Sequence, residues 1–343
     1  MIFFVLVFSF VALVFIRLDN SQRNELINIF NDKTGMSIPL YDSTDETAEE
    51  ESEETNIIKK ITKKTTSKNK YEIYANEAYQ ITDPEIQSTF AILVDADDMV
   101  AVAGRDAGLK MYPASMTKVL TVLVAAENIN ESKLDTDTYT ITQEDIEYAY
   151  LNGFSAVGWI EGDTPTIRDL FYGTILPSGA DAAVGLAKYV AGSHEEFVEM
   201  MNDKLKELGI SETTHFTNCV GLYEDNHYTT ARDMAIIMKA ASENDLCREV
   251  MSAKTYTTTP TLEEPDGIIL SNWFIRKIED KDTHGTVLYA KTGYVEESGC
   301  CAVSYLEGAD GKDYICVTGN STSSWQCIYD HVGIYDAYID DAE

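Results

Sequence analysis

The sequence predicts an α+β fold in which strands from both ends of the chain form one antiparallel sheet, with helices packed on it and a helical lobe beside it. Strand-like apolar runs occur at 88–103 and again at 286–317. The long stretch between them, 143–255, shows mostly helical spacing of apolar residues. With 343 residues, 44% of them hydrophobic, the chain can bury a core of this size.

The first part of this fold is expected to be a hairpin followed by a buried helix. Ser88–Val94 (STFAILV) indicates a buried strand, Asp95–Asp98 a turn, and Met99–Ala103 a second strand. The apolar run Val119–Ala126 then predicts a buried helix over 115–128.

The middle and the end of the chain complete the layers. Apolar residues with helical spacing predict helices at Thr166–Phe171 with Ile175, Asp181–Val190, Phe197–Leu208 and Thr230–Ser242. Strands are predicted at Thr286–Lys291, Cys300–Leu306 and Asp313–Val317, with a closing helix at Ser324–Ala337.

Two segments are expected ahead of the folded domain, which we place at 76–343. Residues 1–17 are apolar apart from Ser9 and Arg17, and no A-x-A-like site follows them, which favours an uncleaved membrane anchor over a cleaved signal peptide. No basic region precedes this run, and Arg17 favours the opposite orientation to that of an exported domain. Residues 18–75 contain an acidic block and a lysine-rich tract, and we expect a disordered linker there.

Charge and cysteine content restrict the partners. The formal net charge is −32, from 58 acidic and 26 basic residues, which argues against nucleic acid and anionic lipid as partners. The six cysteines lack metal-ligand spacing, so no metal or other cofactor is expected. An exported chain can form disulfides, and the pair we consider is Cys300 or Cys301 with Cys316, across neighbouring strands.

A serine and a lysine three residues apart begin the predicted central helix. Ser115 and Lys118 share one helix face, so the amine can reach the hydroxyl. Ser115 would lie in the first turn, where free N–H groups and the helix dipole favour an oxyanion. A buried lysine loses proton affinity and can act as a base. The pattern alone is weak, because Ser67 and Lys70 also match it.

Two later motifs add to this pair. Pro177–Ser178–Gly179 indicates a turn that feeds a helix, with Ser178 either as an N-cap or as a proton relay. Lys291–Thr292–Gly293 ends a predicted strand, where glycine permits close approach of a substrate, and lysine with a hydroxyl can hold a carboxylate.

The order of these motifs resembles that of the penicillin-binding proteins and serine β-lactamases. More closely, the chain is similar to the low-molecular-mass D-alanyl-D-alanine carboxypeptidases of serine peptidase family S11. The resemblance covers most of 85–320 and includes YPASMTK, GDTPTIRDLFYGTILPSGADAA, FVEMMNDKLKELGI, Phe216–Leu222, HYTTARDMA and KTGYVEESGCC. It implies the β-lactamase/transpeptidase-like fold.

The resemblance also implies catalytic roles. Ser115 would attack the peptide bond between two D-alanines at the end of a peptidoglycan stem pentapeptide, and Lys118 would take its proton. Ser178 would relay protons toward the leaving amine. The backbone N–H groups of Ser115 and Tyr294 would form the oxyanion hole.

The family pattern further implies how substrate and inhibitor bind. Lys291 and Thr292 would hold the terminal carboxylate, with Gly293 and Tyr294 beside them. Penicillins mimic the dipeptide and would acylate Ser115. The domain would act outside the cytoplasm, either tethered to the membrane or secreted, and the chain is expected to end with its catalytic domain.

One position departs from the family. The second motif is usually S-x-N, whereas Ala180 stands in the third place here. Loss of one such hydrogen bond would cost about 1–3 kcal/mol, which bears on turnover more than on reaction class. Of the remaining candidates, His215 and His227 are interpreted as structural or solvated residues, and Phe216–Leu222 as a packing turn.

Three alternatives remain from the sequence. A serine β-lactamase is the nearest one, but no E-x-x-L-N motif follows the second motif. A catalytically weak wall-binding or penicillin-binding module is the second, because of Ala180. An endopeptidase that cuts cross-bridges is the third.

Overall fold

The computed structural model describes residues 70–74, 78–261 and 263–339, all within the unit Asn69–Glu343. The segment predicted as an anchor, 1–17, lies outside these residues, as does the linker up to residue 69. Within the described residues, no helix is both long enough and apolar enough to cross a membrane. Ile73 is already buried, and Tyr74 forms a bridge with Val100. The domain boundary at 75/76 stays a prediction.

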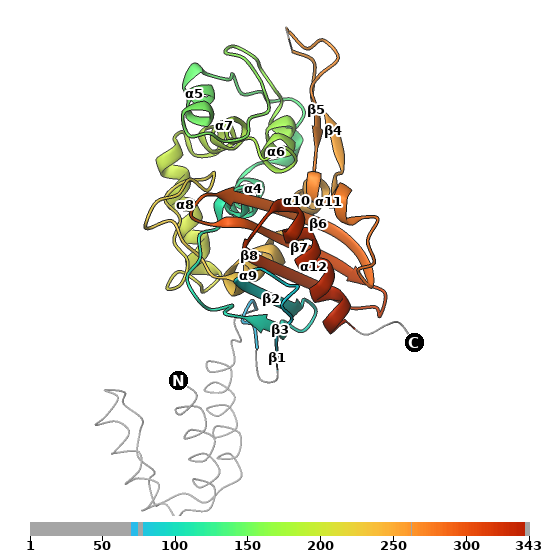
Figure 1. Cartoon of the computed structure of the whole chain (residues 1–343). Helices are drawn as coiled ribbons and strands as arrows, with labels where there is room; N and C mark the ends of the chain where they lie inside the picture. Colours follow the sequence, from blue (N-terminus) through green and yellow to red (C-terminus); the bar gives the residue numbers. More distant parts are fainter. Residues whose placement is uncertain (1–69, 75–77, 262, 340–343) are drawn as a thin grey trace, which may run out of the picture. The chain divides into compact units, whose positions relative to one another are not determined.

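A six-stranded sheet forms the centre of the domain, as the sequence predicts (Figure 1). Its order is β1 (Tyr79–Gln80), β3 (Val100–Arg105), β2 (Phe90–Asp95), β8 (Asp313–Ser321), β7 (Gly299–Gly308), β6 (Gly285–Val295). All neighbours are antiparallel except β1 and β3. Because β2 pairs with β8, an early and a late strand of the domain meet in the middle of the sheet, and β6 is left at one edge.

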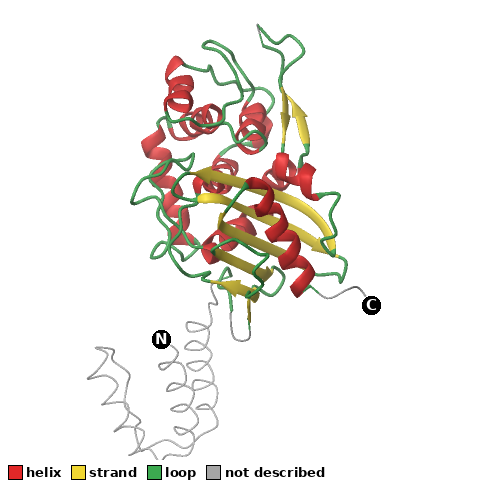
Figure 2. Cartoon of the chain, viewed as in Figure 1, coloured by secondary structure: helices red, strands yellow, loops and turns green. Residues whose placement is uncertain are grey.

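Helices cover both faces of the sheet and build a lobe beyond one end (Figures 1 and 2). On one face, α12 (Ser324–Tyr338) packs on β7 and β8, and α11 (Trp273–Ile278) contacts α12 and β6. On the other face, α9 (Ala231–Ser242) contacts β2, β7 and β8. The remaining helices are α4 (Lys118–Asn128), α5 (Gln143–Leu151), α6 (Ile167–Ile175), α7 (Ala180–Ala191), α8 (His194–Glu207) and α10 (Asp245–Ser252). A short hairpin, β4 (Thr255–Thr257) with β5 (Ile269–Ser271), projects beside the lobe.

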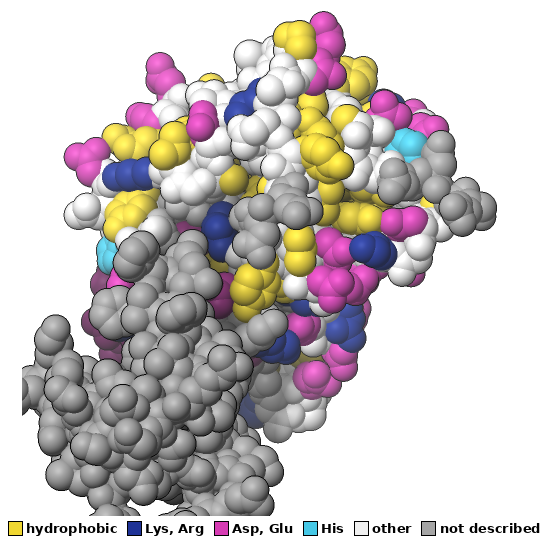
Figure 3. Space-filling model, turned by 90° about the horizontal axis from the view of Figure 1, so that it is seen from below, with side chains coloured by type: hydrophobic (Ala, Val, Ile, Leu, Met, Phe, Trp, Pro, Cys, Tyr) yellow, Lys and Arg dark blue, Asp and Glu magenta, His cyan; other side chains and the backbone are white. Residues whose placement is uncertain are grey.

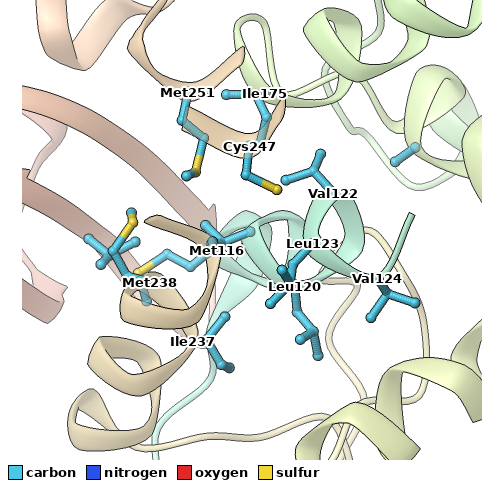
Figure 4. Packing of buried hydrophobic residues seen from close by; sticks show 14 of the residues in the cluster. Met116, Leu120, Val122, Leu123, Val124, Ile175, Ile237, Met238, Cys247 and Met251 are labelled. Carbon is cyan, nitrogen blue, oxygen red and sulfur yellow. The ribbon is translucent and has the colours of Figure 1, made fainter. Parts of the chain in front are cut away.

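The buried hydrophobic residues described form two clusters, and helix α4 is the central element of the larger one, called the larger core below. Every residue from Lys118 to Ala125 is buried, which explains why apolar residues predominate in this stretch of the sequence. Figure 4 shows Leu120, Val122 and Leu123 of α4 surrounded by side chains from α6, α9 and α10. The start of this helix, where Lys118 lies, is therefore held by a packed interior on several sides.

Local sequence signals account for several helix starts. Thr142 with Asp145 and Thr166 with Asp169 form capping boxes at the start of α5 and α6. Helix α7 ends at Gly192, whose φ of +89° is left-handed. The helices predicted over 166–242 are confirmed.

Two local predictions are wrong. The predicted helix over 115–128 begins with a separate 3₁₀ turn, η1 (Ala114–Thr117), so Ser115 precedes α4 rather than lying in its first turn. Lys291–Thr292–Gly293 lies inside β6, which continues to Val295, because β6 pairs with β7 over its whole length.

The disulfide considered from the sequence is also absent, since all six cysteines are free and buried. Register explains this result. Cys316 lies opposite Ser304 on β7, whereas Cys300 lies opposite Ser321. A cross-strand bond needs the two cysteines close together on one face, which this register does not provide.

The acidic composition is visible on the surface. On the face shown in Figure 3, acidic side chains lie among lysine and arginine side chains, the arrangement of a solvated surface. Lys312, for example, donates to Asp95 over 2.8 Å.

Candidate active site

The predicted nucleophile and base are in contact. Lys118 is fully buried, whereas Ser115 is only partly so. The Lys118 Nζ lies 3.0 Å from the Ser115 Oγ, as the three-residue spacing predicts. Ala114, just before the serine, has a φ of +44°, a backbone conformation that alanine rarely adopts. The turn that presents Ser115 is therefore strained, and the surrounding packing must hold it.

Burial changes the proton affinity of this amine. Desolvation lowers the pKa of Lys118 to about 8, against opposing contributions from Cys219 and Asp181. The Nζ also donates to the Val220 carbonyl over 3.0 Å, and it faces the ring of Phe154 at 5.6 Å. At pH 7 about a tenth of the molecules would carry the neutral amine that can accept the serine proton.

The segment 216–222 has a larger role than the packing turn that the sequence indicated. Its Val220 carbonyl accepts from Lys118, which places the segment in the site. The Oδ1 of Asn218 accepts from the amides of Gly221 (2.8 Å) and Leu222 (2.9 Å), which closes the turn. The sequence signal that could have indicated this hydrogen-bonded turn is Asn218 with a glycine three residues later.

Ser178 and Lys291 form a second hydroxyl–amine pair. The Lys291 Nζ donates to the Ser178 Oγ over 2.8 Å and to the Thr292 carbonyl over 2.8 Å. Ser178 has a φ of +63° and is not the N-cap of α7, because Gly179 occupies that position. The relay alternative for Ser178 thus agrees with its contact, and the N-cap alternative does not.

The two pairs lie close enough to influence each other. Lys291 is fully buried, and its pKa is held well below the usual value, first by desolvation and then by the charge of Lys118. One site therefore contains residues from η1, α4, the turn before α7 and β6. In the sequence, 176 positions separate Ser115 from Lys291.

Gly293 brings strand β6 against the turn that presents Ser115. A Cβ at this position would lie 2.8 Å from the Pro113 carbonyl oxygen and 2.9 Å from the Ser115 amide nitrogen. Only glycine permits such an approach without a shift of the backbone. Beside it, Thr292 is partly exposed and the Tyr294 side chain is 64% exposed.

Ala180, where an amide was expected, has an apolar environment. Its side chain is fully buried in the larger core, and its amide donates to the Ser155 carbonyl over 2.8 Å. The next residue, Asp181, accepts from the Val157 amide at 3.0 Å and from the Ala182 amide at 2.8 Å. These contacts tie the 154–157 segment to the start of α7.

Of the two histidines, His227 has the structural role that the sequence indicated. It is buried, its Nε2 lies 2.8 Å from the Thr117 Oγ1, and its Nδ1 accepts from the Thr217 amide at 3.1 Å. Burial lowers its pKa to about 3, so it stays neutral. Exposed His215 contacts the Asn226 carbonyl. Within the described residues, no group of three potential metal ligands occurs.

Comparison with known proteins agrees with the sequence motifs. The model of the peptidase S11 family, D-alanyl-D-alanine carboxypeptidase, matches residues 75–322. The D-alanyl-D-alanine carboxypeptidase of Streptomyces sp. strain K15 is 30% identical over 263 residues, which are 73% of this chain and 86% of that protein. DacF of Bacillus subtilis, also a D-alanyl-D-alanine carboxypeptidase, is 29% identical over 232 residues, 68% of this chain and 57% of the relative. The chain spans 40% of the Escherichia coli carboxypeptidase DacC, at 36% identity.

Solved structures show the same fold. A mutant of the Streptomyces K15 DD-transpeptidase superposes with a TM-score of 0.66 at 25% identity, covering 74% of this chain and 98% of that one. Penicillin binding protein 5 of Haemophilus influenzae gives 0.66 at 26% identity, covering 75% and 72%. The β-lactamase/transpeptidase-like fold is confirmed.

The contact between Gly221 and the turn that presents Ser115 leads to a stability prediction. Gly221 has a φ of +91°, and a Cβ there would lie 1.9 Å from the Ala114 carbonyl oxygen. We expect Gly221→Ala to lower the free energy of unfolding by about 3 kcal/mol or more, because backbone strain and overlap add. Thermal and urea unfolding measure this change.

The control for this variant is Gly311→Ala. Gly311 has a similar φ of +84° but nothing within 4 Å of its Cβ position, so only the backbone strain of about 1 kcal/mol applies. Equal losses in the two variants would contradict the proposed close packing of the 216–222 segment on Ala114.

Proposed function

The chain belongs to the S11 family of D-alanyl-D-alanine carboxypeptidases, and on this basis we propose that it is a serine DD-carboxypeptidase. Its substrate is the peptidoglycan stem peptide that ends in D-Ala-D-Ala, from which it removes the terminal D-alanine. The observation that carries the proposal is the contact of Ser115 with a fully buried amine whose pKa is lowered to about 8. That arrangement supplies a nucleophile and its base.

Acylation follows from this geometry. Neutral Lys118 takes the proton of the Ser115 hydroxyl, and the Oγ attacks the carbonyl carbon of the penultimate D-alanine. The amides of Ser115 and Tyr294 stabilise the oxyanion. When the peptide bond breaks, the proton that Lys118 took passes through Ser178 to the leaving amine, D-alanine departs, and the acyl group stays on Ser115. Water then hydrolyses the ester and regenerates the free serine.

Binding of the substrate carboxylate beside the Ser178–Lys291 pair supports this acylation. Thr292 and Lys291 hold the terminal carboxylate of the substrate, with Gly293 giving access to the edge of β6. A bound carboxylate favours the protonated form of Lys291, whose proton affinity is otherwise reduced by burial and by Lys118. The positive charge on Lys291 in turn favours the neutral form of Lys118. Substrate binding thus helps to generate the base.

Penicillins are expected to be covalent inhibitors, because their lactam carbonyl can react with Ser115 while their carboxylate binds at Lys291 and Thr292. Ala180 leaves the start of α7 without a side-chain amide, so slow turnover is compatible with normal acylation. Fast, multiple turnover of a chromogenic cephalosporin would instead support a β-lactamase.

We further propose that the domain acts outside the cytoplasm, tethered by residues 1–17. The support is the apolar composition of this segment and the lack of a cleavage site. Peptide mapping of the membrane-bound protein by mass spectrometry is expected to recover residues 1–17. A mature protein that lacks residues 1–17 and is found in the culture medium would contradict the tether.

The nucleophile assignment predicts a specific loss of activity. Ser115→Ala is expected to reduce D-alanine release from a pentapeptide by about four orders of magnitude or more and to abolish the penicillin adduct, because no oxygen remains to be acylated. Mass spectrometry of the adduct and a D-alanine assay measure both. The matched control is Ser67→Ala, in the other S-x-x-K sequence, which should keep full activity. An adduct in Ser115→Ala would overturn the assignment.

The lowered pKa of Lys118 predicts the pH dependence of acylation. Since the base must be neutral, the rate constant for penicillin acylation should rise about tenfold per pH unit at acidic to neutral pH and level off above about pH 8. Stopped-flow measurement with a fluorescent penicillin tests this. A rate that keeps rising to about pH 10.5, the ordinary lysine value, would show that Lys118 is not the buried base.

A further inference from the structure

A third histidine, His194, holds the 216–222 segment at Cys219, the residue before Val220, whose carbonyl contacts Lys118. The Cys219 amide donates to the Nε2 of His194 over 3.1 Å. His194 is the first residue of α8, 25 positions earlier in the chain. The sequence motifs of the site do not include it, and the catalytic steps above do not use it.

The bond to His194 fixes one side of Cys219, and α4 fixes the other. The Cys219 carbonyl accepts from the Thr121 Oγ1 over 2.7 Å. The next carbonyl, that of Val220, accepts from the Lys118 Nζ over 3.0 Å and lies 3.5 Å from the Ser115 Oγ. With both peptide groups of Cys219 held, the Val220 carbonyl has little freedom to turn away from Lys118.

The contact requires a particular state of His194. An imidazole nitrogen can accept a hydrogen bond only when it carries no proton, so Nε2 is unprotonated and a neutral ring carries its proton on Nδ1. Burial lowers the pKa of His194 below its ordinary value. The ring packs edge-on against Tyr148 of α5, with centroids 5.6 Å apart.

Charged side chains on three neighbouring segments also change the pKa of His194. Glu195 on α8 and Glu224 after the 216–222 segment raise the pKa of His194, whereas Lys188 on α7 lowers it together with burial. The histidine is therefore neutral at pH 7. On acidification it gains a proton on Nε2, which then faces the Cys219 N–H as a second donor, and the hydrogen bond is lost.

We propose that His194 is a positioning residue for the acylation of Ser115: as a neutral imidazole it holds the Cys219 amide and thereby keeps the Val220 carbonyl on Lys118. This inference rests on the proposed function, since acylation is the step that the contact serves. It makes the site sensitive to acid at a residue outside the three motifs. His194 does not touch the reacting atoms and acts only through the peptide backbone of Cys219 and Val220.

The experiment compares two substitutions of His194 by the rate of penicillin acylation from pH 4.5 to 9. His194→Leu removes the acceptor, and we expect acylation at pH 7.5 to slow about tenfold, because the base is less well placed. In His194→Gln, the amide oxygen can accept from Cys219, so the rate should stay within about twofold of wild type. His215→Leu, the same change at an exposed histidine, is the matched control and should have no effect.

The acid limb of the profile separates positioning from a merely structural role. In wild-type protein, the slope of log rate against pH should become steeper than one at the acid end of this range, where His194 as well as Lys118 gains a proton. In His194→Gln the slope should stay at one, since glutamine does not titrate. Identical slopes in the two proteins, or an unchanged rate in His194→Leu, would overturn the inference.

A spectroscopic measurement keeps the test valid if His194→Leu does not fold. In a ¹H–¹⁵N spectrum of wild-type protein, the Cys219 amide should shift on acidification with the same midpoint as the His194 ring protons, and in His194→Gln it should not shift. A Cys219 amide that does not follow His194 would overturn the contact. Wild-type protein that penicillin does not acylate at all would overturn the proposed function, and this inference with it.

Discussion

The burial of the Lys118 amine is the constraint on which the rest of the site depends. In water, a lysine holds its proton too tightly to serve as a base at neutral pH. Here the first residue of α4 is fully buried, and desolvation brings its pKa to about 8. This needs a core that encloses the start of the helix, and the packing of α4 against α6, α9 and α10 provides it. The fold therefore contributes directly to the chemistry.

The backbone near Ser115 and Ser178 is strained and closely packed. Ala114, just before Ser115, and Ser178 itself both have positive φ values, and Gly293 approaches the Ser115 amide closely. Conformations of this kind persist only where the surrounding structure determines them. Here Gly221 of the 216–222 segment packs on the Ala114 carbonyl, and Gly293 of β6 packs on the Pro113 carbonyl. Ser115 is thus presented by a turn that its neighbours hold on two sides.

Local patterns in the sequence predicted most of the fold, because its strands and helices follow clear apolar periodicities. The mostly apolar run of α4 indicated a buried helix, and the three motifs indicated Ser115, Ser178 and Lys291. The errors concern features set by distant contacts. Strand β6 continues past Lys291 because β7 pairs with it, and Cys316 lies opposite Ser304 because of the β7–β8 register. The contact of the Val220 carbonyl with Lys118 could not be predicted, because every residue type has the same backbone carbonyl.

The central claim is that folding lowers the pKa of Lys118 enough to make it a base. It is tested most directly by a ¹³C NMR titration of the lysine Cε resonances in Ser115→Ala protein, with Lys118 assigned by its absence in a Lys118→Met spectrum. Removal of the serine hydroxyl prevents chemistry while the amine stays buried. The structure predicts a Lys118 midpoint near pH 8, well separated from those of the surface lysines. A midpoint at the ordinary value of 10.5 would contradict the account.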